Sequence, residues 1–111
     1  MNLGLRNKKA IVCGSTQGIG KSIAEELALL GVSITLIARN QNALEEVTSS
    51  LDVSLGQKHD FLCVDFSANN FSERINSLTQ DYDILINNNF TKNTTVLSNI
   101  LLKKIKDLIS F

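Results

Sequence analysis

Three glycines give the clearest chemical signal in this sequence. Gly14, Gly18 and Gly20 lie between an apolar run, residues 10–13, and an amphipathic segment. A tight turn from a strand into a helix needs residues without a Cβ, because positive φ angles are strained for other residues. The N–H groups that start such a helix point into the turn and attract anions. A plain flexible turn is the alternative, but this position predicts a dinucleotide pyrophosphate site formed by Gly14, Ser15, Gln17, Gly18, Ile19 and Gly20.

Arg39 follows the next apolar run, residues 32–38. Ligands of open parallel sheets bind beyond the carboxyl ends of the strands, so this position faces the adenosine ribose. An acidic residue there would bind the ribose hydroxyl of NAD, whereas an arginine suits the 2′-phosphate of NADP. Gln17 supplies no second positive charge. We predict NADP rather than NAD as the cofactor, and a solvated surface arginine is the alternative.

Two further candidate positions follow apolar runs later in the chain. Asp65-Phe66 comes after residues 61–64, and Asn87 comes after residues 82–86. A carboxylate that ends an apolar run is costly unless it is hydrogen-bonded, which marks Asp65 as a candidate binding residue. The alternative is that Asp65 caps a helix, a role that Ser67 can also fill.

These candidate residues need an alternation of strands and helices to bring them together. The apolar and amphipathic patterns predict strands over residues 8–13, 32–38, 61–64 and 82–86, and helices over 18–30, 41–51 and 69–79. Strands separated by helices imply right-handed crossovers and therefore a parallel sheet. We expect an α/β, Rossmann-like fold with strand order 3-2-1-4 and helices on both faces of the sheet.

The helix patterns also predict helix ends and inward faces. Gly31 should end the first helix, and Asn40 should cap the second. The residues predicted to point inward are Ile23, Leu27 and Leu30 in the first helix, and Leu44, Val47 and Leu51 in the second.

The glycine spacing resembles a known family motif. G-x-x-x-G-x-G is similar to T-G-x-x-x-G-I-G of the short-chain dehydrogenase/reductase family, with Cys13 where threonine is commonest. The resemblance covers residues 5–88. It implies a fold that is truncated relative to that of a complete family member. Within the family, residues 5–10 and 38–40 look most like bacterial 3-oxoacyl-(acyl carrier protein) reductase-like proteins.

The resemblance also implies roles for residues after the third and fourth strands. Asp65 would accept a hydrogen bond from the adenine amino group, with the backbone of Phe66 close by. The segment 87–90 resembles the family's N-N-A-G motif, whose first residue, here Asn87, lies near the cofactor. Asn89-Phe90 replaces Ala-Gly, and the lost glycine is the one that lets the family backbone pass beside the nicotinamide ribose.

Catalytic residues of the family are missing from this sequence. The family uses a serine and a Tyr-x-x-x-Lys pair, but Tyr82 is the only tyrosine here and is followed at +4 by Ile86. We interpret Tyr82 as a packing residue. His59, the only histidine, is more typical of a surface or capping residue than of an acid or base. No Cys/His cluster has metal-ligand spacing. We therefore expect no catalytic residue and no metal site in this chain.

Together with the glycine turn and Arg39, the resemblance implies that this chain is the NADP(H)-binding part of an oxidoreductase. Complete family members transfer a hydride between nicotinamide and a small carbonyl or alcohol substrate, whereas this chain alone is expected to be inactive. Whether the chain is an enzyme stays open. The alternative is a non-catalytic nucleotide-binding or interaction module that uses a C-terminal helix or an open strand edge. Through that edge, at the fourth strand, the chain could self-associate.

Residues 90–111 differ in composition from residues 1–89. They contain no Gly, Ala, Glu or Arg, and they carry four lysines and one aspartate, a net charge of +3. The preceding 89 residues hold seven basic and ten acidic side chains, a net charge of −3. We expect a basic amphipathic helix that starts at Thr94 or Thr95 and extends to Leu108. It would pack on the sheet, a membrane or partner groove being the alternative. Our hypothesis for this change in composition is a reading-frame change near codons 88–90, followed by early termination.

Length and overall charge limit the remaining classes. A chain of 111 residues forms one domain at most. The formal net charge of zero gives no reason to expect a nucleic-acid partner. No apolar run reaches the roughly 18 residues of a membrane span, and no secretory segment is present. Cys13 and Cys63 lie in strands that we expect to be buried, so reduced structural thiols and a cytoplasmic protein are predicted.

Overall fold

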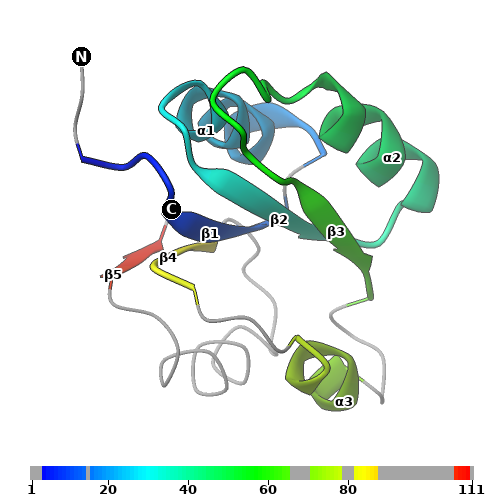
Figure 1. Cartoon of the computed structure of the whole chain (residues 1–111). Helices are drawn as coiled ribbons and strands as arrows, with labels where there is room; N and C mark the ends of the chain where they lie inside the picture. Colours follow the sequence, from blue (N-terminus) through cyan, green and yellow to red (C-terminus); the bar gives the residue numbers. More distant parts are fainter. Residues whose placement is uncertain (1–3, 15, 66–70, 79–81, 88–106, 111) are drawn as a thin grey trace.

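A computed structural model describes residues 4–14, 16–65, 71–78, 82–87 and 107–110. Within these residues the sheet has five parallel strands in the order β3-β2-β1-β4-β5 (Figure 1). The strands are β1 (Lys9–Cys13), β2 (Ser33–Ala38), β3 (Asp60–Cys63), β4 (Ile84–Asn87) and β5 (Asp107–Ser110). The predicted order 3-2-1-4 is confirmed, and β5 extends it by one strand.

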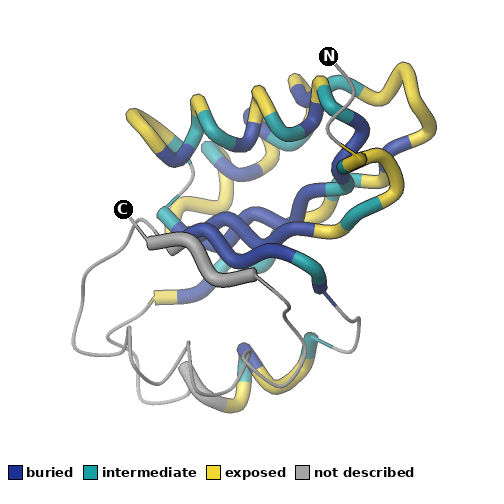
Figure 2. Tube along the Cα trace, turned by 90° about the vertical axis from the view of Figure 1, so that its left-hand side faces the viewer, coloured by how far each residue is buried: buried dark blue, intermediate teal, exposed yellow. Residues whose placement is uncertain are grey.

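Helices lie on both faces of this sheet, as predicted. They are α1 (Gly18–Leu29), α2 (Gln41–Ser50) and α3 (Phe71–Asn76). Figure 1 shows α1 and α2 over one face and α3 over the other. Strand residues therefore divide into two cores: Val12, Ile34 and Leu36 pack toward α1 and α2, while Ile11 and Ile37 pack on the opposite side. Figure 2 shows the buried strands between these layers.

The inward face of α1 differs from the prediction. The buried residues are Gly20, Ala24 and Ala28, whereas Ile23 and Leu27 are only partly buried at the margin of the core. Small side chains let the helix approach the strands closely, and the larger apolar residues then flank this contact. In α2 the predicted inward residues are confirmed, since the buried side chains are Leu44, Val47 and Leu51.

Both predicted helix ends are confirmed. Gly31 has a φ of 91°, and its N–H donates to the Ala28 carbonyl at 3.0 Å. The N–H of Val32 donates to the Leu27 carbonyl at 3.1 Å, which completes a Schellman motif. At the start of α2, the Asn40 side-chain oxygen accepts from the N–H of Ala43 at 3.0 Å. These caps satisfy backbone groups that have no partner within a helix.

Side chains attach the loop between α2 and β3 to the start of β2 and to the end of α1. Nδ1 of His59 accepts from the N–H of Ile34 at 3.0 Å, so Nε2 carries the proton and donates to the Asp52 carbonyl at 2.7 Å. The amide of Gln57 donates to the Ala28 carbonyl at 2.6 Å. His59 therefore acts as a structural residue that takes the place of a strand partner for β2.

The end of the chain departs from the sequence prediction. We expected β4 to present an unpaired edge and the final helix to include Leu108. Instead, residues 107–110 form β5, and Leu108 pairs in register with Leu85 of β4. Parallel pairing on both sides satisfies the backbone of β4, so that strand is no longer an edge. The predicted helix over residues 94–106 lies outside the described residues. The division at residue 89 stays a prediction.

No helix in the described part of the chain is long and apolar enough to span a membrane.

Candidate functional site

The glycine turn has the backbone conformation that its sequence predicts. Gly14 follows β1 with a φ of 69°, and Gly18 begins α1 with a φ of 61°. The Gly14 N–H donates to the Ile37 carbonyl at 2.9 Å, which fixes the start of the turn against β2. A Cβ added at Gly18 would meet no atom within 4 Å, so the requirement for glycine is conformational and the space beside it is open. Gly20 is buried against the sheet.

The N-terminus of α1 can receive an anion. Gln17 occupies the N-cap position in extended conformation, but its side chain makes no capping hydrogen bond. The first turn of α1 contains no acidic residue. N–H groups at this end therefore carry the positive end of the helix dipole without a side-chain acceptor from the N-cap. Ile19 is 60% exposed beside them.

The other predicted site residues gather at the same edge of the sheet. Arg39 directly follows β2 and is exposed. Asp65 lies two residues beyond β3, is also exposed, and takes part in an interaction of its own. Asn87 ends β4 and pairs in register with Cys13, the last residue of β1. Because all strands are parallel, these positions share one edge with the glycine turn. Ser15 and Phe66 lie outside the described residues.

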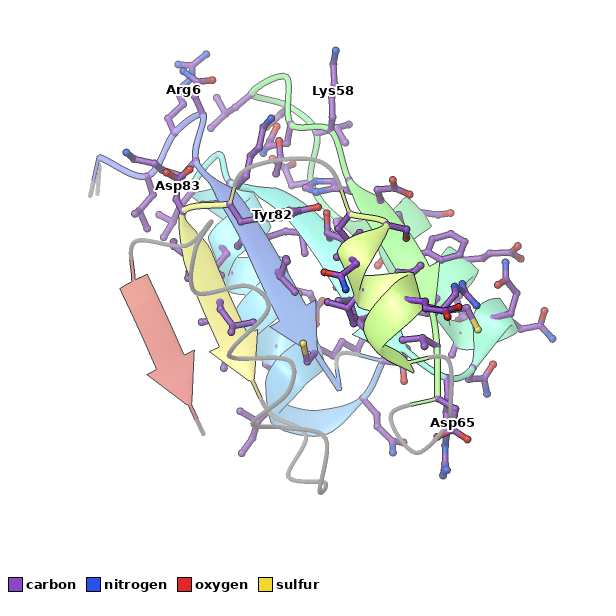
Figure 3. All side chains as sticks on the ribbon, turned by 90° about the horizontal axis from the view of Figure 1, so that it is seen from below. Arg6, Lys58, Asp65, Tyr82 and Asp83 are labelled. Atoms are coloured by element: carbon purple, nitrogen blue, oxygen red, sulfur yellow. The ribbon has the colours of Figure 1, made fainter. Side chains whose placement is uncertain are left out.

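Figure 3 shows how this edge relates to the rest of the molecule. Asp65 lies at the end where the strand arrows point, whereas Arg6 and Lys58 extend from the opposite end. An open surface depression with a volume of about 710 Å³ begins at Gly18 and Ile19 and continues along α1 to Leu27. It shares only those first two residues with the predicted site.

Two residues near Arg39 and Asp65 were not predicted from the sequence. Arg74, on α3, donates from Nη2 to the Cys63 carbonyl at 2.8 Å, and the Cys63 thiol donates to the Arg39 carbonyl at 3.4 Å. Cys63 was expected to be buried but is partly exposed, because β3 is an outer strand of the described sheet. A lone arginine in an amphipathic helix pattern gives no signal of such a contact, since the contact depends on how α3 packs.

Two described side chains of types that can serve as an acid, base or nucleophile, Tyr82 and Cys13, are buried. The Tyr82 hydroxyl lies 3.3 Å from the Thr35 hydroxyl in a buried position, which confirms it as a packing residue. Burial raises the pKa of Tyr82; the hydrogen bond with Thr35 opposes this shift and the charge of Asp60 adds to it. Burial also raises the pKa of the Cys13 thiol far above its ordinary value. Among the described residues, no group of three potential metal ligands occurs.

Comparison with known proteins extends this geometry to a family. A family model described as short chain dehydrogenase matches residues 8–111. Very-long-chain 3-oxoacyl-CoA reductase of Rattus norvegicus is 40% identical over 81 residues, covering 71% of this chain and 26% of that protein. Fatty acyl-CoA reductase of Acinetobacter baylyi is 36% identical over 87 residues, covering 76% of this chain and 30% of that protein.

A solved structure gives the same result. The crystal structure of L-sorbose reductase from Gluconobacter frateurii, complexed with NADPH and L-sorbose, matches with a TM-score of 0.70 and 34% identity. The match covers 82% of this chain and 36% of that one, so this chain spans about a quarter to a third of the length of these three relatives. The finer resemblance to 3-oxoacyl-(acyl carrier protein) reductases stays a prediction, because none of the three carries that name. With a family model that matches nearly the whole sequence, the chain belongs to the short chain dehydrogenase family.

Proposed function

We propose that this chain is the NADP(H)-binding part of an oxidoreductase of the short chain dehydrogenase family. The observation that carries the proposal is the turn between β1 and α1. Two glycines with positive φ, Gly14 and Gly18, lead into a helix whose N-cap side chain leaves the first N–H groups uncapped. A turn of this kind suits a pyrophosphate, because backbone donors and the helix dipole both favour negative charge.

Each residue at this edge has a role that its chemistry supports. N–H groups of the turn and of the first turn of α1 would donate to the pyrophosphate oxygens, and the exposed side chain of Ile19 would cover apolar surface of the ligand. Asp65 would accept a hydrogen bond from the adenine amino group. Asn87, opposite the end of β1, would lie near the nicotinamide half. When bound, the nicotinamide ring supplies or accepts a hydride.

The choice of NADP depends on Arg39. Its guanidinium is exposed directly after β2, where planar, charge-assisted hydrogen bonds to a 2′-phosphate are favourable. The L-sorbose reductase structure, 34% identical to this chain, contains NADPH, which supports a nicotinamide dinucleotide as the cofactor. Arg39 is the residue of this chain that favours the phosphorylated form.

Calorimetric titration of the 111-residue chain with NADP and with NAD tests the proposal. Gly18→Val should weaken both cofactors, because valine strains the φ of 61° and fills the open space beside the turn. Arg39→Glu should weaken the affinity for NADP by about 10- to 100-fold, because a charge-assisted hydrogen bond is lost. The affinity for NAD should not fall. Lys58→Glu is the matched charge reversal at the opposite end of the sheet and should change neither affinity. An NADP-to-NAD preference unmoved by Arg39→Glu would remove the case for NADP.

A turnover assay with NADPH and a panel of ketones separates binding from catalysis. The sequence has one tyrosine, Tyr82, and the structure buries its hydroxyl against Thr35. We therefore expect cofactor binding without turnover in this chain, and small carbonyl or alcohol substrates only for a complete family member. Turnover by the purified chain would contradict this expectation. Failure to bind either dinucleotide would instead favour an interaction module.

A further inference from the structure

The end of β3 is fixed by contacts on three sides. The Val64 N–H donates to the Ala38 carbonyl at 2.8 Å and continues the pairing with β2. The Cys63 thiol donates to the Arg39 carbonyl at 3.4 Å. The Cys63 carbonyl accepts from Nη2 of Arg74 at 2.8 Å. Cys63 therefore links the backbone that follows β2 to a cation on α3.

The position of this carbonyl explains why it needs a side-chain donor. Successive residues of a strand direct their N–H and C=O groups to opposite sides, and Val64 directs its N–H toward β2. The Cys63 carbonyl therefore points away from β2, and β3 is the outermost strand on that side of the described sheet. Arg74 supplies the donor that a further strand would otherwise supply. A guanidinium donor makes this a charge-assisted hydrogen bond, stronger than a neutral one.

Asp65 lies two residues beyond the carbonyl that Arg74 holds. The direction in which the chain leaves β3, and with it the position of Asp65, depends on the orientation of the Cys63–Val64 peptide group. Arg74 is partly buried, and its hydrogen bond to the Cys63 carbonyl fixes where the guanidinium lies. Resting on the proposed function, we propose that Arg74 is a positioning residue for the adenosine half of the cofactor site, acting through the Cys63 carbonyl on the segment that contains Asp65.

The test measures the affinities of NADPH and NADH for the 111-residue chain and for variants of Arg74. Arg74→Gln removes the charge and the reach of the donor, whereas Arg74→Lys keeps the charge and one donor. Lys58→Gln is the control, because it removes one positive charge from an exposed residue at the opposite end of the molecule (Figure 3). Thermal unfolding of each variant, and hydrogen exchange at the Val64 amide, report whether the end of β3 has loosened.

If Arg74 is a positioning residue, Arg74→Gln should weaken the affinities for NADPH and for NADH alike, by about tenfold, or about 1.4 kcal/mol. Adenine is common to both cofactors, so their affinity ratio should change by less than about twofold. Exchange at the Val64 amide should accelerate. Arg74→Lys should restore most of the affinity, and Lys58→Gln should bind as the wild type does. If Arg74→Gln does not fold, Arg74→Lys decides, with an expected loss of about threefold in both affinities.

Other results would overturn the inference. A loss confined to NADPH would mean that Arg74 contacts the 2′-phosphate directly and does not act through Cys63. Unchanged affinities in Arg74→Gln, or in Arg74→Lys where the first variant does not fold, would mean that the contact has no role in the site. Failure of the proposed function has a different signature, because the wild-type chain itself would then bind neither dinucleotide.

Discussion

At the scale of single residues, glycines with the same sign of φ fulfil different needs. Gly18 and Gly56, with φ angles of 61° and 85°, have open space where a Cβ would lie. Gly31, with a φ of 91°, has the Cα of Arg6 3.1 Å from that point and the Arg6 side chain equally close. Conformation alone explains the first two, whereas Gly31 also makes room for the segment that leads into β1.

We therefore predict that Gly31→Ala destabilises the fold more than Gly56→Ala. Positive φ costs an alanine about 1–2 kcal/mol at either position. Only at Gly31 must the neighbouring Arg6 backbone also move. Thermal or urea unfolding of the two variants measures the difference directly. Equal losses of unfolding free energy in both variants would show that the Arg6 segment yields without cost.

At the scale of elements, α1 packs through its smallest residues. Gly20, Ala24 and Ala28 contact the sheet, while Glu25 and Glu26 face solvent. A close helix brings its N-terminus directly to the end of β1, which is where the glycine turn lies. Gly20, in the first turn of α1, belongs both to this helix–strand contact and to the glycine turn.

Ala24→Leu should destabilise the protein by about 1–3 kcal/mol, because Ala24 is fully buried and the added atoms force α1 away from the strands. Glu25→Leu, on the exposed side of the same helix, should change stability by no more than about 0.5 kcal/mol. Chemical denaturation provides the comparison. The close packing that we describe for α1 is wrong if Ala24→Leu is as well tolerated as Glu25→Leu.

At the scale of the whole molecule, the sheet separates a protected centre from its outer strands. Cys13 is fully buried in β1, between β2 and β4, whereas Cys63 is partly exposed on β3. Burial also raises the pKa of the Cys13 thiol, so little reactive thiolate exists in the folded state. Reagents should therefore reach the two thiols by different events, local access at Cys63 and global opening at Cys13.

A disulfide reagent at neutral pH should modify Cys63 in the native state, and Cys13 at least about a thousandfold more slowly, at the rate set by unfolding. Cys63→Ser isolates the slow thiol and Cys13→Ser the fast one. In denaturant both should react at similar rates. Comparable rates for the two thiols without denaturant would mean that the sheet centre opens without global unfolding.

The positions of the described candidate residues at one edge of the sheet could be predicted from the sequence, because each directly follows a strand pattern, whereas their roles stay predictions. A tight turn from a strand into a helix requires positive φ, and glycine at positions 14 and 18 permits it wherever the turn lies in the fold. Arg39 follows an apolar strand, and the parallel topology then carries it to the edge shared by the other strand ends. The caps at Gly31 and Asn40 come from similarly local patterns, whereas the strand order was expected from the rule that connections between parallel strands are right-handed.

Tertiary structure decided what depends on contacts between distant segments. Three features were not predicted from local sequence patterns. They are the buried small residues of α1, the strand at residues 107–110 beside β4, and the contact from Arg74 to Cys63. Each exists because a backbone group or a flat strand surface needs a partner that some other part of the chain supplies. Periodicity along a sequence records which side of an element is apolar, but packing in three dimensions determines what lies against it.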